Sequence, residues 1–331
     1  MAIDIGRRQF ISGLGVATAV WPLAARAQQA PDKVAHIAYL GASSPTAIDP
    51  RQIEQFKAGL AENGLIEGQN ITVDYMWAEG SSARMEQLAA ELAQRNLDVI
   101  VTAGPQPMRA LLAAGIKTPI VFAILNDPTA DGFVQSLARP GGNATGLSMA
   151  GTDMEGKRVE VLKDAVPTVT KLMILHDPTM GTTGLEGVEV VAKAKALQFI
   201  VSEANDPTRY ADMFAAANAQ GINGVAAMAS PVLNFQRKRL IELAAQYRLP
   251  SIWEASVYVR DGGLLSYGPS FPDMYRRSAS YVAKIIGGQR PADLPVQQPV
   301  KFELAVNLQT AKTFGLAIPP ALRAFADEVI E

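Results

Sequence analysis

Short apolar runs alternate with longer segments of helical periodicity along most of the chain after residue 33. Apolar runs rich in Val, Ile and Leu predict buried strands, and apolar residues that recur every three or four positions predict helices packed on them. The predicted strands are 34–40, 71–77, 98–102, 119–125, 171–175, 198–201, 224–229 and 251–254. The predicted helices are 50–63, 83–95, 107–114, 155–165, 187–196, 210–219 and 236–247. This alternation is typical of βαβ units built around parallel sheets.

The cycle of strand and helix begins a second time near residue 171. We therefore expect an α/β protein with two Rossmann-like lobes, each with a parallel sheet. Extended segments at 143–150, 255–267 and 300–307 are expected to connect the lobes as a three-segment hinge. The expected lobe boundaries are 32–146 plus 258–300 for the first lobe and 147–257 plus 301–331 for the second. Ligands of open α/β sheets bind beyond the carboxyl ends of the strands, so the cleft between the lobes is the predicted site.

The first 27 residues have the plan of an export signal. Arg7 and Arg8 precede an apolar run, 10–23, and an Ala-x-Ala site ends at Ala27. This is the pattern of a twin-arginine signal peptide, and we expect cleavage after about Ala27. The apolar run is shorter than the roughly 20 residues that a membrane-spanning helix needs. The sequence therefore predicts a periplasmic protein that does not span a membrane once it is processed.

Composition removes several classes of function. The 331 residues include no cysteine, which excludes thiol catalysis, cysteine-bound zinc, iron–sulfur clusters and a lipidated cysteine anchor. The 30 basic and 32 acidic residues form no block of like charge, so a nucleic-acid partner is not expected. The two histidines, His36 and His176, have no partner at metal-ligand spacing. We therefore expect neither a metal nor a cofactor.

One segment imitates a phosphate-binding loop. Residues 151–157 match the GxxxxGK pattern after an apolar run, but Arg158 stands where a Ser or Thr would hold Mg²⁺. Asp153 and Glu155 also put two carboxylates where phosphates would be bound. We interpret the segment as a lobe crossing that leads into an amphipathic helix, with Lys157 and Arg158 in solvent.

Polar residues follow the predicted strands in both halves, where a ligand of the cleft would meet them. Candidates in the first half are Ser43, Ser44, Gly104, Gln106 and Asp127. Candidates in the second half are Ser230, Asn234, Trp253 and Glu254. Neutral polar groups with few carboxylates and an aromatic ring suit a small polar or zwitterionic ligand with a flat apolar part. The alternative is structural, because such residues often cap helices or form turns, and a tryptophan often belongs to the core.

Ordered motifs also carry a family resemblance. They lie at 59–71, 77–80, 97–101, 136–146, 156–158, 262–268, 291–296 and 301–304, and include Trp77-Ala78-Glu79-Gly80 and Lys301-Phe302-Glu303-Leu304. With them the sequence resembles the substrate-binding proteins of ABC transporters, in the family that includes tryptophan- and tyrosine-type solute receptors. The resemblance implies the type I periplasmic-binding fold, ABC permease subunits of the inner membrane as partners, and no catalysis.

The resemblance further implies ligand contacts at eight of the nine candidate positions, all except Trp253. Two residues depart from the family pattern, namely Asp131, where Gly or Ser is expected, and Trp253, where Tyr is more usual. We therefore expect a receptor that closes its lobes on a small organic ligand, amino-acid-like or aromatic. The alternative is an exported α/β hydrolase that uses cleft carboxylates such as Asp127 and Glu254. A transcription regulator of the same fold would need an N-terminal helix-turn-helix, and the export signal occupies that place.

Overall fold

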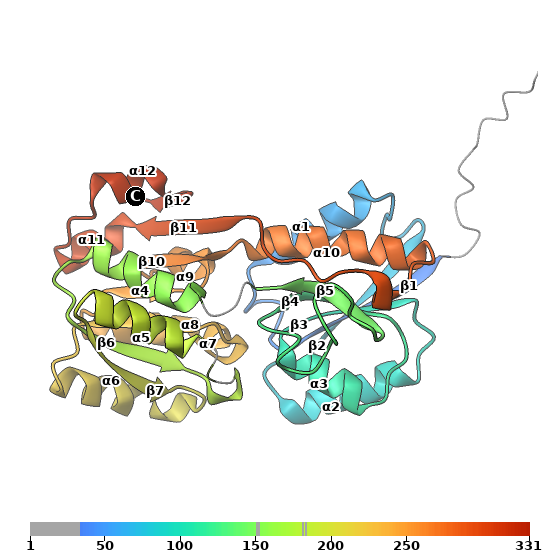
Figure 1. Ribbon diagram of the computed structural model, residues 1–331, viewed down its shortest axis with the longest axis horizontal. Helices are drawn as coiled ribbons and strands as arrows, with labels where there is room; N and C mark the ends of the chain where they lie inside the picture. The colour runs from blue at the N-terminus through green and yellow to red at the C-terminus, as the bar shows by residue number, and fades with distance from the viewer. Residues whose placement is uncertain (1–33, 150–152, 181, 183) are drawn as a thin grey trace, which may run out of the picture. The chain divides into compact units, whose positions relative to one another are not determined.

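The computed structural model describes residues 34–331 except 150–152, 181 and 183. The predicted export signal at 1–27 lies outside the described residues. Val34–Glu331 forms one compact unit, in which the strands make two separate sheets of five and seven strands (Figure 1). The two-lobed α/β architecture predicted from the sequence is thereby confirmed.

The five-stranded sheet is entirely parallel, with the strand order β2-β1-β3-β4-β5. Its strands are β1 (Ala35–Gly41), β2 (Ile71–Trp77), β3 (Val99–Ala103), β4 (Ile120–Leu125) and β5 (Ala144–Ser148). Its helices are α1 (Pro50–Glu62), α2 (Ser82–Ala93), α3 (Pro105–Ala113) and α10 (Phe271–Ile286). Helices α1 and α10 lie side by side on one face, where they share a core, and α2 and α3 cover the other face (Figure 1).

The seven-stranded sheet has the order β12-β11-β10-β9-β8-β6-β7, and β10 and β11 are its antiparallel pair. Its strands are β6 (Lys171–His176), β7 (Gln198–Glu203), β8 (Gly224–Ala227), β9 (Ser251–Trp253), β10 (Leu265–Pro269), β11 (Phe302–Asn307) and β12 (Glu328–Ile330). Its longer helices are α4 (Asp153–Ala165), α5 (Leu185–Ala194), α6 (Tyr210–Ala219), α8 (Arg237–Gln246) and α11 (Leu308–Phe314). Shorter ones are α7 (Pro231–Phe235), α9 (Ser256–Arg260), α12 (Pro320–Phe325) and the 3₁₀ turns Pro178–Met180 and Pro207–Arg209. A further 3₁₀ turn, Pro291–Asp293, lies beside β5 of the five-stranded sheet.

The predicted strands and helices are all present, with ends that differ by at most two residues. One expectation about the crossings is wrong. Segment 255–267 was expected to be extended, but it contains α9 and most of β10. The range 258–300, assigned above to the first lobe, therefore includes a strand that bonds to β9 and β11 of the seven-stranded sheet. Pairing on both edges satisfies the backbone of β10, and the chain leaves this sheet only at Ser270.

Helix α10 was not predicted, although its sequence has the usual signals. Ser270 caps it by accepting a hydrogen bond from the backbone of Asp273, and a proline follows within the first turn. Met274, Tyr275, Ser278 and Val282 then face the core at helical spacing. The chain returns from α10 through the turn at Pro291–Asp293 to β11, so α10 belongs to the five-stranded sheet although the strands before and after it do not.

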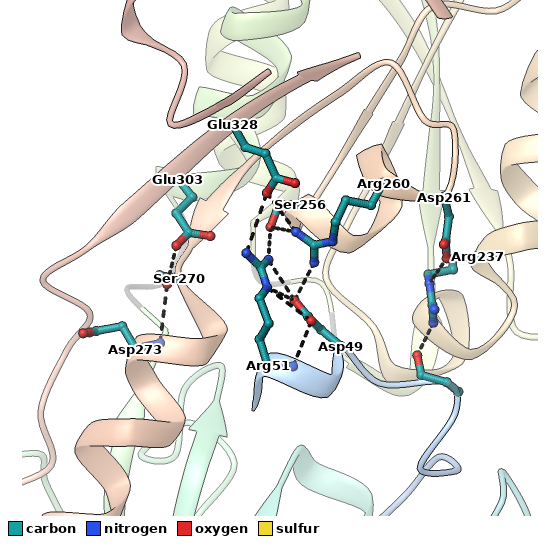
Figure 2. Close-up of polar contacts among 11 residues, drawn as sticks. Asp49, Arg51, Arg237, Ser256, Arg260, Asp261, Ser270, Asp273, Glu303 and Glu328 are labelled. Atoms are coloured by element: carbon teal, nitrogen blue, oxygen red, sulfur yellow. Dashed lines mark hydrogen bonds and ion pairs between the residues drawn. The ribbon is translucent and has the colours of Figure 1, made fainter. Parts of the chain in front are cut away.

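Polar side chains join the start of α1 to elements of the seven-stranded sheet (Figure 2). The Asp49 carboxylate accepts from Arg51 at 2.9 Å and from Arg260 of α9 at 2.6 Å. Both arginines also contact Glu328 of β12, at 3.7 and 2.8 Å, and both donate to Ser256. These five residues, here called the α1–α9 polar cluster, hold two positive and two negative charges. Asp49 is only 6% exposed, so its charge needs these partners.

The contact of α1 with α10 depends on Gly59. A methyl group at this position would overlap the carbonyl oxygen of Arg276 and lie 2.9 Å from the Cβ of Ala279. We expect Gly59→Ala to lower the free energy of unfolding by about 1–3 kcal/mol, because two backbones must separate, even though alanine favours a helix. Urea denaturation measures this, with the exposed Ala61→Ser in the same helix as control. An unchanged midpoint for Gly59→Ala would contradict the close packing.

Candidate ligand-binding site

A cavity of about 660 Å³, partly open to solvent, lies against loops at the carboxyl ends of strands from both sheets. This is where open α/β sheets bind their ligands. Its polar lining consists of Ser43, Gln52, Asn126, Ser230, Asn234 and Glu254. Glu254 is the one Asp, Glu, Lys, Arg or His residue among the described residues that line the cavity.

Aromatic and methionine side chains supply much of the apolar wall. Tyr39 of β1 and Tyr275 of α10 line the cavity, and their hydroxyl oxygens are 2.8 Å apart. Phe271, Met149 and Met180 line it as well. Burial raises the pKa of Tyr275 to about 12, and burial together with Tyr275 raises the pKa of Tyr39 well above its ordinary value. Both phenols are therefore neutral at physiological pH, and the wall suits a flat apolar group.

Ser230 fixes one corner of the cavity. Its hydroxyl donates to the buried carboxylate of Asp177 at 2.7 Å and accepts from the backbone of Val232 at 3.1 Å, so it caps α7. The other oxygen of Asp177 accepts from Thr179, at 2.7 Å from the hydroxyl and 3.0 Å from the backbone. The Ser230 hydroxyl therefore already has its partners, and its main effect is to hold the loop between β8 and α7.

Two amide oxygens beside the cavity have no such partners. Oδ1 of Asn234 and Oε1 of Gln106 are buried and make no hydrogen bond to any residue that the structure describes. The Gln106 oxygen would lie 3.6 Å from a Cβ at Gly104, which lines the cavity. An unpaired buried acceptor costs about 1–3 kcal/mol. Asn234 lines the cavity, so its oxygen would gain from a ligand that donates a hydrogen bond.

Three ionisable groups lie together beneath the cavity. Arg158 of α4 is 2% exposed and forms an ion pair with Glu155, which is 12% exposed. Its guanidinium also donates to the carbonyl of Tyr267 at 2.9 Å and to that of Ala227 at 3.2 Å. The expectation that Arg158 lies in solvent is therefore wrong, whereas Lys157 is exposed as predicted. Adjacent residues of a helix point about 100° apart, so Arg158 can reach the carbonyls of β8 and β10 while Lys157 remains exposed.

Glu254 is 4% exposed and has no direct bond to Arg158 among the described contacts. Burial raises the pKa of Glu254 to about 8, the nearby Glu155 carboxylate adds to this rise, and Arg158 and the backbone N–H of Ser230 oppose it. The carboxyl is thus mostly protonated at neutral pH. A glycine at 268 permits the close strand packing here, since a Cβ would overlap the carbonyl oxygen of Glu254.

The structure brings together five of the nine candidate residues. Those that line the cavity are Ser43, Gly104, Ser230, Asn234 and Glu254. Gln106 lies just behind Gly104, and Ser44 follows Ser43 with its hydroxyl 3.1 Å from that of Thr46. Asp127 caps a turn by accepting from the backbones of Thr129 and Ala130.

Trp253 lies in the core. It has no exposed surface, stacks on Tyr258 with ring centroids 4.9 Å apart, and donates to Ser251 at 2.9 Å. Successive side chains of an extended chain point to opposite sides, so Trp253 enters the core while Glu254 reaches the cavity.

Several functional candidates were missed from the sequence. Asn126 directly precedes Asp127 and, as the residue closer to the end of β4, is the one that reaches the cavity. Tyr39 lies within a strand, and Phe271 and Tyr275 lie on the unpredicted α10. Arg158 gave one signal, a charged residue in the apolar stripe of Val159, Leu162 and Ala165, as a helical projection would have revealed.

The described residues hold no cluster of three or more His, Asp or Glu side chains that could bind a metal ion. Among these residues, too, no helix combines the length and the apolar character that a membrane crossing requires.

Arg158 and Lys157 provide a matched pair of substitutions. We expect Arg158→Met to lower the free energy of unfolding by about 3–5 kcal/mol, because Glu155 loses the partner of its buried charge. Lys157→Met removes only an exposed pair with Glu160 and is expected to change it by less than about 1 kcal/mol. Urea denaturation compares them. The double variant Arg158→Met with Glu155→Gln should recover much of the loss, and equal effects of the two single variants would contradict the buried pair.

Glu254 should make stability depend on pH. Its pKa is higher in the folded protein than in the unfolded chain, so its contribution is present at pH 4 and is lost as the pH rises toward about 8. Glu254→Gln lacks this titration. The free energy of unfolding of the variant minus that of the natural protein should therefore increase by roughly 2–4 kcal/mol between pH 5 and pH 9. Chemical denaturation at several pH values tests this, and a constant difference would show that Glu254 is ionised throughout.

Comparison with known proteins gives the family. Residues 47–330 match the model of the family described as ABC transporter substrate binding protein. A tyrosine-binding protein of Clostridioides difficile (strain R20291) is 22% identical over 263 residues, which cover 79% of this chain and 75% of that protein.

Solved structures agree with this fold. A conserved domain protein from Vibrio cholerae O1 biovar El Tor has a TM-score of 0.82 at 27% identity, covering 90% of this chain and all of that one. The ABC domain of Streptococcus pneumoniae in complex with L-Trp has a TM-score of 0.82 at 22% identity, covering 89% and 99% of the two chains. Since the family model spans most of the sequence and the fold and cavity agree with it, this chain belongs to the substrate-binding proteins of ABC transporters.

Proposed function

We propose that this protein is the periplasmic receptor of an ABC importer and captures a small organic ligand between its two lobes. The observation that carries the proposal is the cavity lined from both sheets, with unpaired amide oxygens beside an aromatic wall. A ligand that contacts both lobes stabilises the closed arrangement, because only a difference in contacts between two states shifts their populations. Family membership supports the same reading.

The ligand is proposed to be amino-acid-like or aromatic. The neutral phenols of Tyr39 and Tyr275 and the ring of Phe271 offer a flat apolar surface, and Asn234 and Glu254 offer polar contacts on the other side. Relatives that carry tyrosine and L-Trp in their names support this class of ligand. The hydrolase alternative finds no support, because Asp127 is outside the lining and holds a turn, and the described residues that line the cavity include one carboxyl group, that of Glu254.

The proposal includes export and a membrane partner. The twin-arginine pattern with cleavage after about Ala27 supports delivery to the periplasm, where the receptor would hand its ligand to permease subunits of the inner membrane. We also propose that the hinge includes Ser270 and residues 298–301, since each of these passages separates elements of different sheets.

Binding assays test the proposal. We expect isothermal titration of the purified protein with a panel of amino acids and aromatic amines to find saturable binding to at least one compound. Asn234→Leu is expected to weaken that binding tenfold or more, because it removes an acceptor of the ligand's hydrogen bond. Asn218→Leu, an exposed change on α6, is the control and should bind normally. No binding by any compound, or equal binding by both variants, would contradict the proposed site.

A further inference from the structure

We propose that the ligand binds by exchanging a cation for a proton, so that an ammonium group of the ligand takes the place of a proton held by Glu254. This inference rests on the proposed function and names the group that the receptor selects. In the exchange the O–H bond of the Glu254 carboxyl breaks, its proton passes to the buffer, and the carboxylate accepts a hydrogen bond from the ammonium group. Arg158, Glu155 and the protonated Glu254 carry no net charge before binding, and with Glu254 ionised and the ammonium group bound these groups again carry none.

The charge balance beneath the cavity carries the argument. Arg158 supplies one positive charge, whereas Glu155 and Glu254 could supply two negative charges. The arginine pairs directly with Glu155 and donates further hydrogen bonds to two backbone carbonyls. If Glu254 were ionised in the ligand-free protein, its charge would be buried without a counter-ion in contact, which is unfavourable. A bound proton removes that charge, and a bound cation would balance it.

The groups that face Glu254 come from every element around it. Helix α4 contributes Arg158 and Glu155, α7 contributes the backbone N–H of Ser230, and α9 contributes Tyr258. Tyr258 stays neutral, since burial raises its pKa well above the ordinary value, and its hydroxyl has no partner among the described residues. Strand β10 passes beside the backbone carbonyl of Glu254 at Gly268. No lysine or arginine appears among the described residues that line the cavity, so the balancing cation has to come from the ligand.

The titration of Glu254 fits this exchange. With a pKa of about 8, the carboxyl is roughly ten times more often protonated than ionised at pH 7. A ligand that requires the ionised form therefore releases close to one proton when it binds at this pH. Its affinity rises with pH until Glu254 is ionised in the free protein, and this rise is about tenfold or more between pH 6 and pH 8. Ordinary amines stay protonated in that range, so the rise belongs to the protein.

Because the Glu254 carboxylate accepts a hydrogen bond from an ammonium group, the site is expected to select primary amines over related compounds that lack an amino group. Three probes separate the possibilities: L-tryptophan with an ammonium and a carboxylate, tryptamine with an ammonium only, and indole-3-propionate with a carboxylate only. Tryptophan and tryptamine are expected to bind, each with the release of about one proton at pH 7. Indole-3-propionate is expected to bind at least tenfold more weakly. Isothermal titration in buffers with different ionisation enthalpies counts the protons.

Two variants complete the experiment. Glu254→Gln should bind the amines at least tenfold more weakly at pH 8, release no proton and lose the pH dependence, whereas Glu189→Gln on the exposed face of α5 should behave as the natural protein. Binding of the amines without proton release, or indole-3-propionate bound as tightly as the amines, would overturn the exchange while leaving the receptor function intact. Failure of all three probes to bind would contradict both the exchange and the proposed ligand class.

A measurement without ligand tests the exchange separately from the receptor function. Infrared spectra of the free protein at pH 6–7 should show the carbonyl stretch of a protonated carboxyl that is missing from Glu254→Gln. If that band is absent from the natural protein, Glu254 is already ionised in the free protein. The exchange is then wrong, whichever of the three probes the protein binds.

Discussion

Two largely buried carboxyl groups, Glu155 and Glu254, lie near a single guanidinium, and much of the site is organised around this excess of acidic groups. Arg158 holds α4 against the strands through carbonyl groups of β8 and β10 as well as through Glu155. A shift of the helix would take the guanidinium away from these two carbonyls and leave buried hydrogen-bonding groups without partners, which is costly. Because two carboxyl groups lie near one guanidinium, a negative charge on Glu254 is not compensated by the protein. One arrangement thus provides both a fixed wall and a group that can respond to what enters the cavity.

The regular elements could be predicted because their signals are local. Strands such as β6 and β8 are short runs of apolar residues, and helices such as α1 show their buried face at helical spacing. The membership of β10 in the second sheet could not be predicted in this way, because it depends on partners before and after a long excursion of the chain. Pairing across such a distance leaves no periodic trace in the strand itself.

The loops that approach the ligand were predictable in outline and less so in detail. Strand ends identify Ser43, Gly104, Ser230, Asn234 and Glu254, since the carboxyl ends of parallel strands meet at one edge. Sequence position alone cannot tell which of two neighbours turns inward, so Asn126 reaches the cavity where Asp127 was expected, and Trp253 packs in the core. Tyr39 and Tyr275 could not be predicted for another reason. In the sequence, a buried tyrosine that lines a cavity cannot be distinguished from one that belongs to the core.

The α1–α9 polar cluster links β12 to the start of α1. Glu328 lies three residues before the last residue, yet it shares both arginines with Asp49, which starts the helix that carries Gln52 into the cavity (Figure 2). Strand β12 therefore forms the edge of its sheet and also supplies a carboxylate to the polar cluster. Loss of β12 would remove Glu328 and leave Arg51 and Arg260 with Asp49 as their carboxylate partner, at the start of the helix that carries Gln52.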